Sequence, residues 1–150
     1  MRESESMLEL FAPLLSGAIT GKRKPAHHFR IVHSLNEVRE ERAVVIGRVG
    51  TKVPPEWELV TVGAAGGFFG PRELHRVLDG IVSSLSKDPD RAIVIACPEY
   101  LALHNGFNAL FKFLNDVRDY AILHGGRVYL ITDESSWDPR EFALLKRLEG

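Results

Sequence analysis

Three runs of consecutive apolar residues constrain the fold of this chain more than any other feature. The runs lie within residues 43–47, 91–97 and 127–132, and in the first two the apolar residues follow one another without the polar alternation of a half-exposed strand. A continuous run of this length is typical of a strand that is buried on both faces. The runs therefore predict the inner strands of a parallel sheet.

Helix-like segments separate these runs and supply the crossover connections that parallel strands need. Residues 71–86 and 101–124 carry apolar residues at helical spacing, with Pro71 suited to a first helical position and Gly125-Gly126 to a helix end. Asp138-Pro139-Arg140-Glu141 is typical of a helix start. Residues 28–33 and 57–62 are weaker strand candidates, and residues 35–42 a short polar helix.

This alternation predicts a three-layer α/β sandwich. We expect a mostly parallel central sheet of about five strands with helices on both faces, the usual arrangement when strand and helix alternate. Residues 91–132 form the clearest strand–helix–strand unit, for which we expect a right-handed crossover.

The N-terminal part has a different character. Residues 4–16 have the spacing of an amphipathic helix, and residues 21–25 form a basic linker of sequence Gly-Lys-Arg-Lys-Pro. We therefore expect an N-terminal helix and linker over residues 1–24 and a single α/β domain over residues 25–150.

Composition limits the function classes. The 150 residues include 19 Lys and Arg against 20 Asp and Glu, so no basic excess favours nucleic-acid binding, and we expect none. No apolar run is long enough to span a bilayer, and acidic residues stand where a signal peptide is basic, which indicates a cytoplasmic protein. The absence of Gln among many charged residues suggests a thermophilic source.

The carboxyl ends of parallel strands are the usual place for a ligand in an α/β sheet. Five residues follow predicted strands and are our ligand-binding candidates: Arg48, Gly66, Gly67, Glu99 and Tyr100. Arg48 suits a phosphate, and the glycines suit a close backbone approach to one. The structural alternatives are a plain surface loop for the glycines, a helix-dipole charge for Glu99 and a core ring for Tyr100.

Motifs of known catalytic machinery are missing or incomplete. Residues 17–23 differ from a phosphate-binding loop in spacing, in the Arg23 that replaces a hydroxyl residue, and in the absence of a preceding strand. The six histidines show no metal-ligand spacing, and Cys97 at a strand end is better explained as a small buried residue. We therefore expect no catalytic residues, no metal and no cofactor.

Apolar residues outside the expected core indicate a partner surface. The partner-interface candidates lie on the N-terminal helix and in the glycine-rich loop: Leu8, Phe11, Leu15, Phe68 and Phe69. In the predicted helix over residues 101–124, Leu103, Phe107 and Leu110 open a core stripe, while other apolar residues lie away from it. This surplus favours a protein partner or a homo-oligomer.

Several segments resemble an archaeal family catalogued only as domain of unknown function 835. Residues 92–101, ending in Glu99-Tyr100-Leu101, resemble its leucine-aspartate-glycine-x-glutamate-tyrosine-leucine segment. Residues 105–107, 110–114 and 139–148 are similar to its later helices, and residues 46–48 and 70–74 to an earlier strand and a helix start. The resemblance covers about residues 43–149.

The resemblance implies an α/β sandwich similar to a RecA-like nucleotide-binding core that lacks the phosphate loop. Family members are commonly joined to membrane or signalling segments, which implies an interaction or regulatory module. Ala96 stands where the family has an acidic residue at the end of its central strand. That position would hold Mg²⁺ in a phosphate-loop enzyme, so Ala96 weakens a catalytic interpretation further.

Two functions remain from the sequence. The first is a non-enzymatic protein-interaction or regulatory module that self-associates. The second is a degenerate nucleotide- or phospholigand-binding domain without hydrolysis, which would use Arg48, the loop glycines, Glu99 and Tyr100.

Overall fold

A computed structural model describes residues 27–150, and its centre is a five-stranded sheet in which every pairing is parallel. The strands are β1 (Phe29–Val32), β2 (Ala43–Arg48), β3 (Glu58–Val62), β4 (Ala92–Ile95) and β5 (Val128–Ile131), in the spatial order β1-β5-β4-β2-β3. All four residues of β4 and the first five of β2 are buried, as their continuous apolar runs predict. The predicted parallel α/β sandwich is therefore confirmed. Leu8, Phe11 and Leu15 lie outside the described residues.

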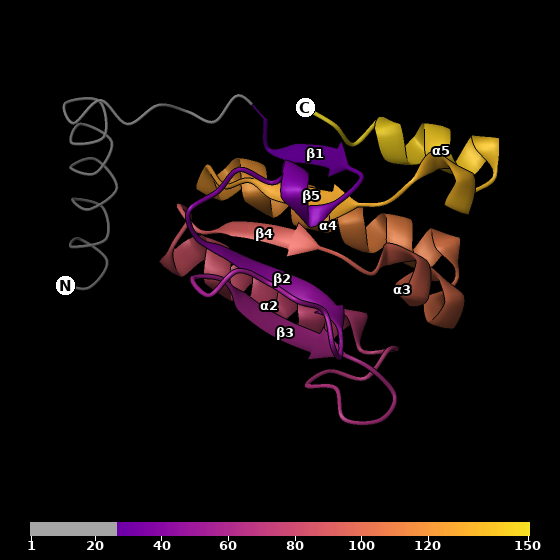
Figure 1. Cartoon of the computed structure of the whole chain (residues 1–150). Coiled ribbons are helices and arrows are strands. Elements are labelled where there is room, and N and C mark those ends of the chain that lie inside the picture. Colours follow the sequence, from indigo (N-terminus) through magenta and orange to yellow (C-terminus); the bar gives the residue numbers. More distant parts are fainter. Residues whose placement is uncertain (1–26) are drawn as a thin grey trace, which may run out of the picture.

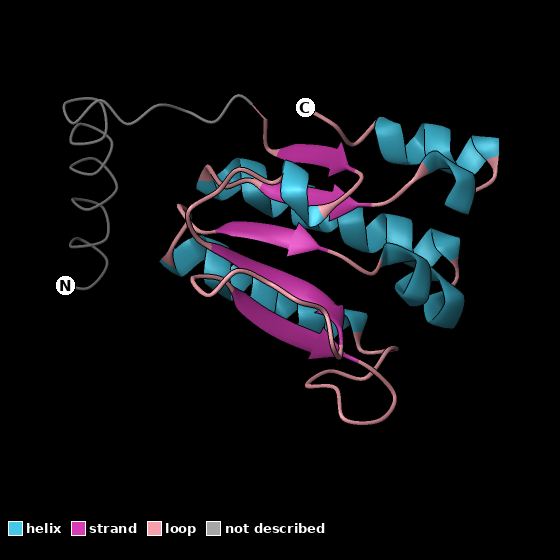
Figure 2. Ribbon diagram, in the orientation of Figure 1, coloured by secondary structure: helices cyan, strands magenta, loops and turns pink. Residues whose placement is uncertain are grey.

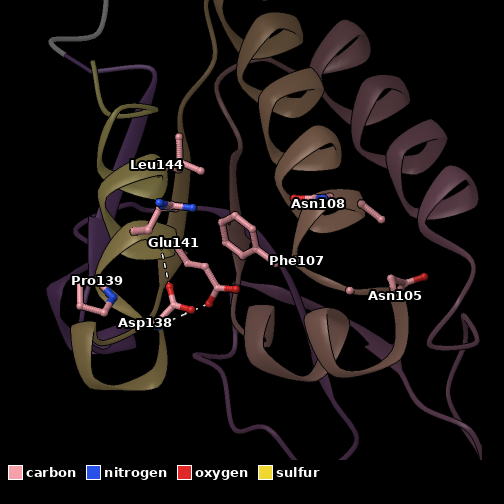
Figure 3. Close-up of a pocket in the computed structure, with 10 residues that line it drawn as sticks. Asn105, Phe107, Asn108, Asp138, Pro139, Glu141 and Leu144 are labelled. Atoms are coloured by element: carbon pink, nitrogen blue, oxygen red, sulfur yellow. Dashed lines mark hydrogen bonds between the residues drawn. The ribbon is translucent and has the colours of Figure 1, made fainter.

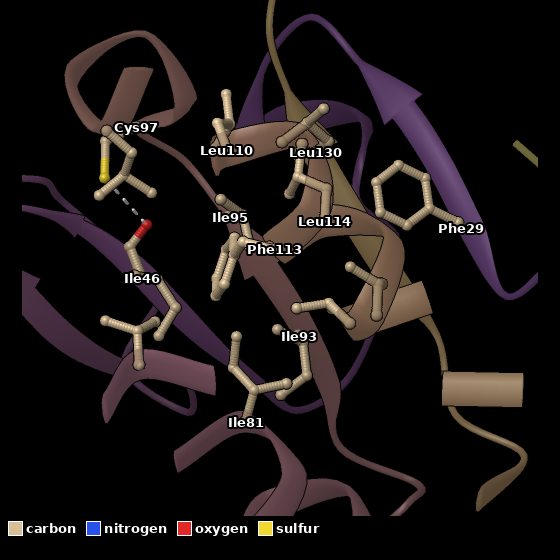
Figure 4. Close-up of a cluster of buried hydrophobic side chains, with 14 of the residues drawn as sticks. Phe29, Ile46, Ile81, Ile93, Ile95, Cys97, Leu110, Phe113, Leu114 and Leu130 are labelled. Atoms are coloured by element: carbon tan, nitrogen blue, oxygen red, sulfur yellow. Dashed lines mark hydrogen bonds between the residues drawn. The ribbon is translucent and has the colours of Figure 1, made fainter. Parts of the chain in front are cut away.

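The α-helices cover one face of the sheet (Figures 1 and 2). They are α2 (Leu74–Lys87), α3 (Pro98–Asn105), α4 (Phe107–His124) and α5 (Pro139–Lys146). Their buried residues join those of β2, β4, β5 and β1 in the main core, where Ile93, Ile95 and Leu114 are fully buried (Figure 4). None of the helices between residues 27 and 150 combines the length and the apolarity needed to cross a membrane.

The sequence also predicts helices on the opposite face, but no α-helix between residues 27 and 150 lies there, and this face is covered in a different way. In the described part of the chain, its cover is the 3-10 helix η1 (Leu35–Glu37) and the extended segments around it and between β2 and β3. Val38 and Trp57 from these segments pack on Val45 and Val94 of the sheet. The predicted polar helix over residues 35–42 is wrong beyond Glu37, because Glu40 turns inward to bond Arg127 and Tyr129 of the sheet.

The predicted single helix over residues 101–124 is also wrong. It begins earlier, at Pro98, and Gly106 divides it into α3 and α4 with φ of 85°, a conformation that favours glycine. The N–H of Gly106 closes α3 on the carbonyl of Ala102, and its carbonyl accepts the N–H of Leu110 in α4. The break takes Leu103 out of phase with the core stripe, so 78% of its surface is exposed.

The helix ends follow local chemistry. Gly125 ends α4 in the left-handed conformation, and Asp138 begins α5 with a reciprocal capping box to Glu141, both as predicted. Helix α2 begins at Leu74 rather than at Pro71, and the Glu73 carboxylate just before it accepts the N–H of Gly70 at 2.7 Å without bonding a helix N–H. Glu73 thus brings a carboxylate to the start of α2.

Candidate functional site

The strand order creates a switch point at the carboxyl ends of β2 and β4. These strands are neighbours, but the chain leaves β2 toward the face covered by extended segments and leaves β4 toward the helix face. A crevice between strands that diverge in this way is the usual ligand site of an open α/β sheet. Arg48 ends β2, and Glu99 and Tyr100 lie in the first turn of α3 after β4.

The structure brings Arg48 and Tyr100 together across this switch point. The guanidinium carbon of Arg48 lies 3.7 Å from the centre of the Tyr100 ring, a cation–π contact. The Tyr100 ring also contacts His104, with 4.6 Å between the ring centres. The two ligand candidates thus contact each other and bridge the crevice.

Glu99 has a separate partner. Its Oε2 accepts the hydroxyl of Thr132 at the end of β5, and Thr132 Oγ1 accepts the indole N–H of Trp137 at 2.8 Å. Trp137 also packs edge-on against Phe107, with 5.7 Å between ring centres. Glu99 therefore ties the start of α3 to β5. No sequence pattern singled out Thr132 or Trp137, although Thr132 is the one buried polar residue in the described part of the chain.

Gly66 and Gly67 lie in a tight turn of the loop after β3. Gly66 has φ of 82°, and a Cβ on Gly67 would lie 2.3 Å from the backbone nitrogen of Gly63. The N–H of Gly63 bonds the carbonyl of Phe69, the N–H of Phe69 bonds the carbonyl of Thr61, and the N–H of Phe68 bonds Thr61 Oγ1. The N–H groups of Gly63, Phe68 and Phe69 are therefore used within the fold. Phe68 is 69% exposed, as a partner contact requires. Phe69 is buried in the core, so it is not available to a partner.

Both helix starts at this edge already carry a carboxylate. Glu99 is in the first turn of α3, and Glu73 is the capping residue of α2. The Gly70 N–H and the Arg76 guanidinium lower the pKa of Glu73 below its usual value, so Glu73 stays ionised at neutral pH. A negative charge at a helix N-terminus satisfies the dipole that would otherwise attract a phosphate.

Cys97 lies at the same edge but is buried beneath it. Its Sγ faces the carbonyl oxygen of Ile46 at 3.8 Å (Figure 4). Burial raises the pKa of Cys97 to about 12, a rise that Arg48 opposes and Glu99 reinforces. The side chain is therefore a neutral thiol at neutral pH.

A neutral, buried Cys97 predicts slow reaction with thiol reagents. In the native protein, we expect a disulfide reagent such as Ellman's reagent to modify Cys97 far more slowly than in denaturant, because the thiolate is the reactive form. Stopped-flow or manual absorbance measurements with and without urea check this. A native rate equal to the denatured rate would contradict the assignment of Cys97 as a structural residue.

An open groove lies between the starts of α4 and α5 (Figure 3). This open groove of about 760 Å³ is lined by residues 105–109, 138–141 and 144. Its carboxylates, Asp138 and Glu141, bond each other's backbone N–H groups in the capping box. Within residues 27–150, no group of three or more His, Cys, Asp or Glu side chains is placed to hold a metal ion.

No curated protein matches the chain. The family described as protein of unknown function (DUF835) matches residues 24–148, which is most of the chain. The chain belongs to this family.

Proposed function

We propose that the chain is a non-enzymatic protein-interaction or regulatory module of the cytoplasm. It self-associates through a surface that we call the carboxyl-edge surface, formed by Val49, Phe68, Leu103 and the neighbouring Arg48–Tyr100 pair. The supporting observation is that three of the six exposed large apolar side chains in the described part of the chain follow the carboxyl ends of strands. Val49, Phe68 and Leu103 are 58%, 69% and 78% exposed, and they follow β2, β3 and β4 respectively.

Parallel strands end at the same edge of their sheet, so these three side chains belong to one edge of the molecule. Exposed large apolar side chains grouped on one side are typical of protein-binding surfaces. The switch-point crevice at this edge is bridged by Arg48 and Tyr100, and the nearby thiol is neutral. This edge therefore offers contact area rather than a reactive group.

The low net charge of the chain favours a second copy of the chain as the partner that binds the carboxyl-edge surface. The net charge of the full sequence is -1, so two copies repel each other little. Tyr and Arg are enriched in protein interfaces, and both are present at the centre of this surface. A two-fold arrangement would place the same surface on both subunits.

We expect the full chain to self-associate between low micromolar and several hundred micromolar concentration, and Leu103→Asp to abolish this by placing a charge in the apolar contact. Sedimentation velocity measures both. Leu123→Asp is the matched control, because Leu123 is similarly exposed, at 71%, but lies at the end of α4. A monomer at every concentration, or equal effects of the two substitutions, would refute the proposal.

Phospholigand binding is the second candidate, favoured by one observation. Among the described residues, no carboxylate lies within ion-pair distance of the Arg48 guanidinium. A phosphate could displace the Tyr100 ring from it. If millimolar nucleotides or phosphorylated metabolites raised the Tm of the wild-type protein but not of Arg48→Ala, this candidate would replace the interaction module.

A further inference from the structure

The end of α4 carries exposed apolar side chains that the proposed self-association does not use. Tyr120, Ile122 and Leu123 are 37%, 44% and 71% exposed and lie within the last five residues of the helix. They are the other three of the six exposed large apolar side chains in the described part of the chain. The core stripe of α4 is already buried, so these three form a second apolar surface, which we call the α4-end surface.

The α4-end surface and the carboxyl-edge surface lie at opposite edges of the sheet. Helix α4 ends at His124 and β5 begins at Val128, so the end of α4 lies where β5 begins. All the strands are parallel and therefore begin at this same edge. A two-fold contact through the carboxyl-edge surface thus leaves the α4-end surface uncovered.

The described part of the chain begins beside the α4-end surface. Strand β1 pairs with β5, and the carbonyl of His28 accepts the N–H of Val128 at 2.9 Å. His28 Nδ1 also lies 2.8 Å from the carbonyl oxygen of Gly126, just after the end of α4. The amino end of β1 and the end of α4 are therefore side by side (Figure 1). The chain before His27 starts from this side of the domain.

The preceding sequence supplies an apolar segment of matching chemistry. Residues 4–16 lie outside the described residues, but their sequence repeats Leu8, Phe11 and Leu15 at intervals of three and four, which places all three on one face of a helix. Residues 17–26 connect this segment to the described chain. Fully extended, that linker spans about 33 Å, more than the length of roughly 20 Å of a helix over residues 4–16. The segment can therefore reach the whole α4-end surface.

Charge and tethering favour this segment over a second copy of the chain as the occupant. The linker carries Lys22, Arg23 and Lys24 and leaves the domain beside the carboxyl end of α4, where the helix dipole is negative and cations are favourable. A short flexible tether gives its segment a local concentration on the order of millimolar. A second copy at micromolar concentration competes poorly with such a segment.

We infer that residues 4–16 pack on the α4-end surface of the same chain. Leu8, Phe11 and Leu15 cover Leu123 and the apolar side chains beside it. This contact goes beyond the proposed self-association, because it uses the opposite edge of the sheet. It gives the apolar residues of the N-terminal segment a partner within the chain and leaves the carboxyl-edge surface open to a second copy.

A spin label at position 6 of the full chain tests the contact. Because Cys97 is buried and its thiol neutral, a thiol-specific label modifies Ser6→Cys in the native protein. In the isotope-labelled protein, the label is expected to weaken the amide signals of residues 120–125 and to leave those of Val49 and Phe68 at full intensity. Equal weakening of both groups, or none in either, would overturn the inference.

A mixed sample separates the two possible sources of the segment. Spin-labelled chains without isotope are added to isotope-labelled chains that keep Ser6. If the contact forms within one chain, residues 120–125 keep full intensity in this mixture. Weakening of residues 120–125 in the mixture equal to that in the singly labelled protein would show that a second copy supplies the segment, and would overturn the inference.

Substitutions on the two sides of the contact locate it. Leu123→Asp is expected to restore the signals of residues 120–125 by placing a charge in the apolar contact, while Leu103→Asp, similarly exposed at the other edge, keeps them weak. Phe11→Asp should act like Leu123→Asp, and it decides the result if Leu123→Asp does not fold. Signals that stay weak in both Leu123→Asp and Phe11→Asp would overturn the contact.

The two proposals fail separately. A contact within one chain does not hold two chains together, so Leu123→Asp frees the segment without lowering self-association. Sedimentation of Leu103→Asp against Leu123→Asp therefore still tests the carboxyl-edge surface alone, and the spin-label experiment tests the α4-end surface alone.

Discussion

Replacing Glu40 by Gln is expected to lower the free energy of unfolding by about 3 kcal/mol, because it removes one partner of a largely buried ion pair. The Glu40 carboxylate accepts two bonds from Arg127, at 2.7 and 2.8 Å, and one from the Tyr129 hydroxyl at 2.6 Å. The Glu40 and Arg127 side chains are only 11% and 24% exposed. Urea denaturation followed by circular dichroism measures the loss.

The network matters for the fold because it fixes the segment that covers the second face of the sheet. The backbone carbonyl of Glu40 also accepts the indole N–H of Trp57, which packs on that face. Burial, together with the bond to Glu40, raises the pKa of Tyr129 to about 12, so its hydroxyl remains a donor at neutral pH. Gln at position 40 keeps the size of the side chain but leaves Arg127 without a charged partner.

An exposed ion pair supplies the control. Arg42 Nη1 and Asp88 Oδ2 are 2.6 Å apart, but the side chains of Arg42 and Asp88 are 49% and 37% exposed. Solvent screens such a pair, so Asp88→Asn is expected to lower the free energy of unfolding far less than Glu40→Gln. Equal losses for Glu40→Gln and Asp88→Asn would show that the network around Glu40 does not hold this face together.

The strands could be predicted because burial on both faces leaves a direct mark on the sequence. A strand such as β4 contacts apolar atoms on both sides, so no position in it tolerates a polar side chain. The helix ends at Gly125 and Asp138 could be predicted for a similar reason, since each depends on residues within one turn. Short-range chemistry of this kind is readable from one sequence.

Features set by distant contacts could not be predicted. The spacing of Leu103 and Leu110 fits one continuous helix, whereas the chain breaks at Gly106, beside which Asn105 Nδ2 donates to the carbonyl of Pro71 at 2.8 Å. The order of the strands likewise follows from packing across the whole sheet. The cover of the second face by extended segments has no periodic pattern to reveal it.

The candidate site also has one part that could be predicted from the sequence and one part that could not. Arg48 and Tyr100 were placed at one crevice because each follows the carboxyl end of a strand, and they do contact each other. That they stack rather than leave the crevice open depends on side-chain geometry, which the sequence does not state. The bond between Thr132 and Glu99 joins residues 33 positions apart, and no local motif marks it.

Leu114→Ala is expected to lower the free energy of unfolding by about 3 to 4 kcal/mol. Leu114 is in the middle of α4, fully buried, and packs in the main core with Ile95 and Leu130 (Figure 4). Truncation removes apolar contacts and leaves a cavity that the rigid sheet beneath it cannot fill. Urea denaturation at low micromolar protein concentration, where self-association does not contribute, measures the change.

Leu103→Ala is the informative control, because a continuous helix and a broken one predict different results for it. In one continuous helix, Leu103 and Leu114 share the core stripe and both substitutions are costly. With the break at Gly106, Leu103 is 78% exposed and its truncation should change the free energy of unfolding by no more than about 0.5 kcal/mol. A loss at Leu103 as large as that at Leu114 would contradict the break, and with it the exposure of Leu103 on which the carboxyl-edge surface depends.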